Sequence, residues 1–85
     1  MHSLNKIGTL TDMNKIIVLF IKGVKYNPML KWDSEDDFKL ALHTGVGLPK
    51  PDDIVVEAYI NDNLVDLGNT FETTLAKLKL ILNID

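Results

Sequence analysis

The chain contains no cysteine, no arginine and no glutamine among its 85 residues. Without cysteine it can form neither a disulfide nor a thiolate metal site, which is typical of proteins from a reducing compartment. Without arginine, bidentate clamping of phosphate or carboxylate groups by guanidinium is excluded, because all nine basic residues are lysines. The formal net charge of −3 argues against a nucleic-acid partner, since such proteins usually carry a basic patch.

Long apolar runs are also scarce. The longest, residues 16–21, is far shorter than the roughly 20 residues that a membrane-spanning helix needs. Residues 1–4 lack the basic region and the following apolar run of a signal peptide. We therefore expect an intracellular protein, cytoplasmic or nuclear, that has no membrane partner.

The length and composition fit one small domain. A hydrophobic fraction of 46% is normal for a globular protein and allows a compact core. Residues 1–12 are polar and weakly patterned, so we interpret them as an N-terminal tail or linker. Residues 13–85 are then the folded domain.

Three strands are predicted from apolar, β-branched segments. Residues 16–21 are too short for a helix and are predicted to form a buried central strand. A second strand is predicted over residues 26–32, at an edge or with a bulge because it contains Pro28. A third is predicted over residues 53–60, followed by a polar turn and a short return strand over residues 64–67.

One main helix is predicted between the second and third strands. Ser34 is a good N-cap, and the three acidic residues after it suit the positive end of the helix dipole. Phe38, Ala41 and Leu42 follow at the spacing of one apolar helix face. Gly45 ends the helix, because glycine readily adopts the left-handed conformation found there.

The C-terminal segment fits two patterns. Residues 69–72 predict a capped helical turn, and apolar residues at positions 71, 75, 78 and 82 would share one helix face. From Lys77, however, apolar residues alternate with surface ones at Leu78, Leu80, Leu82 and Ile84. We predict a strand from Lys77, because four apolar residues in phase bury a whole strand face.

This order of elements resembles the ubiquitin-like β-grasp fold. Residues 47–52, Gly-Leu-Pro-Lys-Pro-Asp, are similar to the Gly-Ile-Pro-Pro-Asp stretch of that family, and residues 64–67 to its Leu-x-Asp return strand. The alternating segment from Lys77 is similar to its closing strand. The resemblance implies an α+β domain, with a mixed sheet of four to five strands packed on one main helix.

The same resemblance implies a role in protein binding. The chain ends Asn83-Ile84-Asp85, without the terminal Gly-Gly of conjugated modifiers, so we expect the non-conjugated type. Domains of this type bind partners through the sheet surface, or assemble as PB1-like, DIX-like or Ras-association scaffold modules. The residues that correspond to the binding patch are Val24, Val55, Tyr59, Lys79 and Ile81.

The predicted first strand is apolar on both faces. Ile17, Leu19 and Ile21 lie on one face, and Ile16, Val18 and Phe20 lie on the other. A β-grasp sheet carries its helix on one side only. The second face must therefore be covered by residues 1–12, by self-association or by a partner.

No constellation of residues points to catalysis. His43 has no serine, cysteine or paired carboxylate at a usable spacing, and the acidic residues 33–37 lack the pattern of a calcium loop. We expect no enzyme activity, no cofactor and no metal. The predicted function is non-catalytic binding of another protein through the sheet surface. The alternatives are a self-assembling scaffold module and a small inhibitor encoded by a phage or mobile element.

Overall fold

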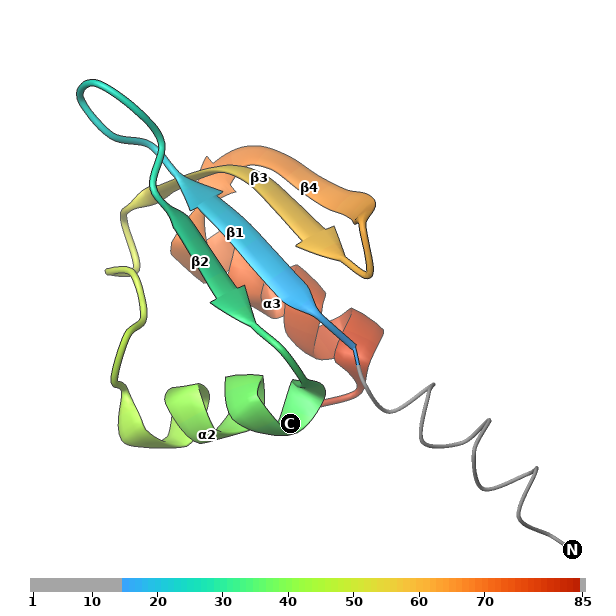
Figure 1. Ribbon diagram of the computed structural model, residues 1–85. Helices are drawn as coiled ribbons and strands as arrows, with labels where there is room; N and C mark the ends of the chain where they lie inside the picture. Colours follow the sequence, from blue (N-terminus) through green and yellow to red (C-terminus); the bar gives the residue numbers. More distant parts are fainter. Residues whose placement is uncertain (1–14, 85) are drawn as a thin grey trace, which may run out of the picture.

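The computed structural model describes residues 15–84 as a four-stranded antiparallel sheet with two helices (Figure 1). The sheet order is β2-β1-β3-β4, and each neighbouring pair is antiparallel. The domain is therefore α+β, as predicted, but its sheet is antiparallel rather than mixed. The elements in chain order are β1 (Ile17–Ile21), β2 (Met29–Trp32), α2 (Glu35–Thr44), β3 (Ile54–Ile60), β4 (Asn63–Thr70) and α3 (Phe71–Leu82).

The strongly apolar β1 lies at the centre of the sheet, between β2 and β3. Its partner β2 is shorter than predicted and begins only after Pro28. The carbonyl of Pro28 accepts a hydrogen bond from the Ile21 amide at 2.9 Å, but proline has no amide hydrogen to continue the ladder. Residues 22–28 consequently form a loop that projects beyond the sheet (Figure 1).

Helix α2 has the ends that the sequence predicts. The Ser34 hydroxyl accepts a hydrogen bond from the Asp37 amide at 3.1 Å, and Gly45 ends the helix at φ 77°. Phe38 and Ala41 are buried. The Phe38 ring meets Trp32 of β2 edge-on, with 4.9 Å between the ring centroids, which fixes the helix against the end of that strand.

The predicted closing strand from Lys77 is wrong, because these residues belong to helix α3. The Thr70 hydroxyl caps the helix by accepting from the Thr73 amide, and Asn83 ends it in the left-handed conformation. Leu78 and Leu82 are buried, whereas Leu80 is 82% exposed. The helical period of the buried positions thus prevails over the alternation by two.

The β-grasp topology is not confirmed. The element similar to the family's last strand is helix α3, and β3 pairs directly with the central strand β1. Two helices, rather than one main helix, complete the core. In Figure 1, α3 crosses behind the sheet and α2 lies below the end of β2.

The core lies between these helices and the inner face of the sheet. β1 contributes Ile17 and Leu19, both fully buried, and the other buried members come from both helices and β3. They are Phe38, Val55, Ala58, Ile60, Phe71, Leu78 and Leu82. None of the described helices is long and apolar enough to cross a membrane.

A β-bulge in β3 decides which of its residues face the core. Phe20 pairs with Glu57 and Ile21 pairs with Val55, so Val56 has no partner in β1. The bulge shifts the alternation, and Val55 lies on the same face as Ala58. The prediction that Val55 shares a solvent-exposed face with Glu57 and Tyr59 is therefore wrong.

Candidate functional site: the open face of the sheet

The face of the sheet opposite the core is built from side chains of all four strands. Residues paired across antiparallel strands share a face, so the register gives its members directly. One row runs Lys31, Val18, Tyr59, Leu64, and the next runs Met29, Phe20, Glu57, Leu67. We call these eight residues the open face.

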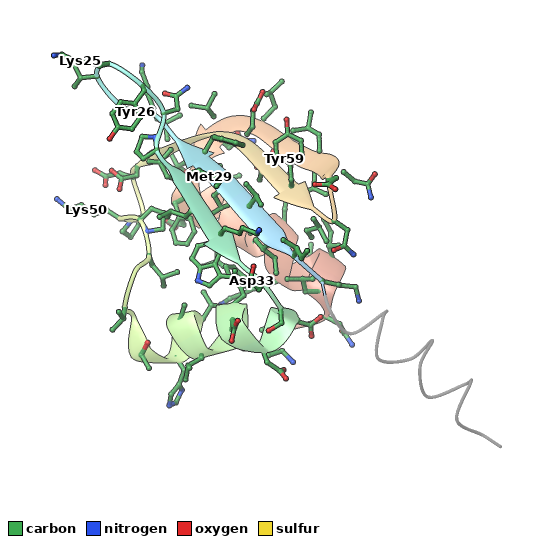
Figure 2. All side chains as sticks on the ribbon, in the orientation of Figure 1. Lys25, Tyr26, Met29, Asp33, Lys50 and Tyr59 are labelled. Atoms are coloured by element: carbon green, nitrogen blue, oxygen red, sulfur yellow. The ribbon has the colours of Figure 1, made fainter. Side chains whose placement is uncertain are left out.

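No helix or strand within residues 15–84 covers the open face. The helix α3 packs on the other side, where Thr74 contacts the inward-pointing Asp66. Met29 is 54% exposed and Leu67 is 62% exposed, although both are large apolar residues. Figure 2 shows Met29 and Tyr59 on the near side of the sheet, with α3 behind it.

The centre of the open face carries an aromatic pair. The rings of Phe20 and Tyr59 meet edge-on, with 6.1 Å between their centroids. A shallow hollow of about 380 Å³ lies beside this pair. It is lined by Val18, Phe20, Met29, Glu57, Tyr59 and Asp62.

Two of the residues that line the hollow are acidic. Glu57 and Asp62 both line it, and no lysine among residues 15–84 lies within ion-pair distance of either carboxylate. Lys31, the only cation of the open face, pairs instead with Asp33 at 3.6 Å. Desolvation and the Glu57 carboxylate raise the pKa of Tyr59, so its hydroxyl stays a neutral hydrogen-bond donor and acceptor.

A separate polar cluster, centred on Asp66, stabilises the fold. Asp66 points to the core side of the sheet, and its carboxylate accepts hydrogen bonds from Asn69 at 2.7 Å, Lys77 at 2.8 Å and Thr74 at 3.0 Å. Burial alone would raise the pKa of Asp66, but the hydrogen bonds outweigh burial and hold it below 3.8. The cluster joins β4 to α3, and its polar atoms are already satisfied.

The structure does not bring the predicted site residues together. Val24 is fully exposed in the loop between β1 and β2, and Val55 is fully buried in the core. Lys79 and Ile81 are on α3, on the other side of the sheet. Of the five, Tyr59 alone lies on the open face. Lys79 and Ile81 do not share a sheet face with Tyr59, because they lie in a helix rather than in the expected strand.

Sequence reasoning did not assign Phe20, Met29 or Leu67 to the site. One signal pointed there, namely that the first strand is apolar on both faces. The structure accounts for that signal, since Ile17 and Leu19 face the core and Val18 and Phe20 belong to the open face. Residues 1–12, which were one expected cover, lie outside the described residues.

The described part of the chain gives little support for metal binding or for catalysis by histidine. Residues 15–84 contain no group of three or more His, Cys, Asp or Glu side chains placed to hold a metal ion. His43 lies exposed in the last turn of α2. No family model, no curated protein and no solved structure matches this chain.

Proposed function

We propose that this domain binds another protein through the open face of its sheet. The observation that carries the proposal is the contiguous apolar surface formed by four strands and left without a cover by residues 15–84. Single exposed apolar residues are ordinary, but a contiguous patch of them usually marks an interaction site. The role is the one expected from the ubiquitin-like resemblance, whereas the surface is a different one.

The composition of the face suits a protein partner. Aromatic residues and methionine are enriched at the centres of protein interfaces. Phe20 and Tyr59 occupy the two central strands of this surface, and Met29 lies next to Phe20 on the edge strand β2. The face contains a single lysine, which is ion-paired, and the chain has a net charge of −3. A nucleic-acid backbone would meet a surface of the wrong charge.

The face is a better candidate than the edges of the sheet. The edge strand β4 contains Gly68 at φ 69°, and a register irregularity leaves Val65 without a partner in β3. Such irregularities twist an edge away from regular pairing with another strand. The other edge strand, β2, has only four residues. Assembly of copies through strand edges is therefore the weaker hypothesis.

Charge insertion on the open face tests the proposal. Met29→Asp and Leu67→Asp place a carboxylate on the face at exposed positions, so the fold should survive. Leu80→Asp is the matched control, because Leu80 is exposed on α3 on the other side of the sheet. The three variants and the parent chain are used as baits in extract of the source organism, and captured proteins are quantified by mass spectrometry.

We expect a protein that the parent chain and Leu80→Asp capture equally and that both open-face variants lose. Circular dichroism must show the same fold for all four baits. If capture survives both open-face substitutions, the open face is not the binding surface. Sedimentation equilibrium of the parent chain identifies the case in which the captured partner is a second copy.

A further inference from the structure

We infer that the acidic, aromatic hollow on the open face receives a basic side chain of the partner, with arginine preferred over lysine. The inference rests on the proposed function, because it names the chemistry of the residue that docks there. Three features carry it: the charge of the hollow, the aromatic pair beside it and the composition of the chain itself.

The first feature is charge. A partner that covers the open face removes water from the half-buried Glu57 carboxylate. Desolvating a carboxylate without a compensating cation or donor is strongly unfavourable. No described lysine pairs with Glu57 or Asp62, and Lys31 is engaged with Asp33. The Tyr59 hydroxyl beside Glu57 brings no positive charge, so a basic side chain of the partner supplies the compensation.

The second feature is the aromatic wall. Phe20 and Tyr59 lie side by side at the hollow, and an aromatic face attracts a cation placed against it. A guanidinium group is planar, stacks on aromatic rings and offers several hydrogen-bond donors to a carboxylate, whereas an ammonium is a compact, strongly hydrated charge. A carboxylate beside two aromatic rings therefore favours arginine.

The third feature is composition. The chain contains no arginine, so neither its own N-terminal residues nor a second copy can supply the preferred group. A second copy that docked through its own open face would also bring its own Glu57 and add negative charge to the hollow. Taken with the proposed function, the occupant is a segment of the partner protein, in which an arginine is flanked by apolar residues that lie on Met29 and Leu67.

The experiment uses two short peptides as probes and the full chain as the receptor. Acetyl-Leu-Arg-Leu-amide is compared with acetyl-Leu-citrulline-Leu-amide, which has nearly the same shape without the charge. Each peptide is titrated into ¹⁵N-labelled protein to millimolar concentration, and Kd is taken from the amide shifts. The titrations are repeated with Glu57→Gln and with the matched control Glu72→Gln, at an exposed position in α3.

We expect the arginine peptide to shift amides of Phe20, Glu57 and Tyr59 and to bind roughly fivefold more tightly than the citrulline peptide. Glu57→Gln should remove most of that difference, and Glu72→Gln should leave it intact. Substituting lysine for arginine in the peptide should weaken binding.

Two results overturn the inference. Equal affinity of both peptides, with shifts on the open face, refutes the basic side chain but leaves the open face as the binding surface. Absence of shifts on the open face with both peptides refutes the hollow as a site. In either case the capture experiment decides the proposed function separately, because it uses whole partners and apolar-to-aspartate variants.

Discussion

The free energy of unfolding should fall by about 2 kcal/mol when Asp66 is replaced by asparagine. Asparagine keeps the shape of the side chain but loses the charge and one of the two acceptor oxygens. The Thr74 hydroxyl donates a hydrogen bond to that carboxylate. Because Thr74 is fully buried, water cannot replace the acceptor that is lost. Lys77 loses less, because its side chain is half exposed and its ion pair is screened by solvent.

The estimate follows from the three hydrogen bonds that the carboxylate accepts. A bond to a charged group contributes roughly 1.5–3 kcal/mol, and asparagine can retain part of the set by keeping one oxygen. For a domain of this size, about 2 kcal/mol corresponds to a fall in Tm of roughly 8–16 °C. Urea unfolding followed by the fluorescence of Trp32, the only tryptophan, measures the change.

The effect should also depend on pH, with a defined sign. The folded state holds the pKa of Asp66 below 3.8, so the carboxylate stabilises the fold at neutral pH. That stabilisation begins to be lost when the pH falls below 3.8, the ordinary pKa of aspartate in the unfolded chain. It is lost fully once the pH has fallen through the lowered pKa of the folded state. The difference between the parent chain and Asp66→Asn should therefore shrink under acidic conditions.

Asp62→Asn is the matched control, because it removes the same charge from an exposed turn. The reasoning about Asp66 is refuted if both variants unfold at the same urea concentration at neutral pH. It is also refuted if the deficit of Asp66→Asn stays the same in acid, since the carboxylate would then contribute nothing through its charge.

Three further predictions concern α3 and the open face. Leu78→Ala should cost about 2–5 kcal/mol, whereas Leu80→Ala should change stability by less than about 0.5 kcal/mol, because Leu80 is exposed. Urea unfolding of both variants distinguishes the helix from a strand, in which the two residues would share one face. Thr70→Ala should cost about 1 kcal/mol through the lost N-cap of α3, with Thr70→Ser close to the parent chain in the same assay. Glu57→Gln should lower the pKa of Tyr59 toward its ordinary value in an NMR titration, and an unchanged pKa would show that desolvation alone raises it.

The parts of the fold that local chemistry controls were predictable. Helix α2 follows from its cap at Ser34 and its glycine at Gly45, because both act within a few residues of their own position. The strands β1 and β3 follow from dense β-branched segments, and the turn between β3 and β4 follows from Asn61 and Asp62, both of which adopt positive φ.

The parts of the fold that depend on pairing between distant segments could not be predicted from the sequence. The alternation from Lys77 is compatible with a strand, and no local feature shows that the place beside β1 is taken by β3. The bulge at Val56 arises from the register between β1 and β3, and it moves Val55 from the expected surface into the core. The binding patch expected from sequence depended on both points, which account for the displacement of three of its residues, Val55, Lys79 and Ile81.

The sequence by itself determined the α+β class, the capped helix α2 and the presence of a first strand too apolar for a sheet covered on one side. These follow from the conformational preferences and hydrophobicity of neighbouring residues. Only the tertiary structure decided that residues 71–82 form a helix, that β3 is bulged, and which side of the sheet stays open. The physical reason is that packing partners far apart in the chain choose between conformations whose local free energies are similar.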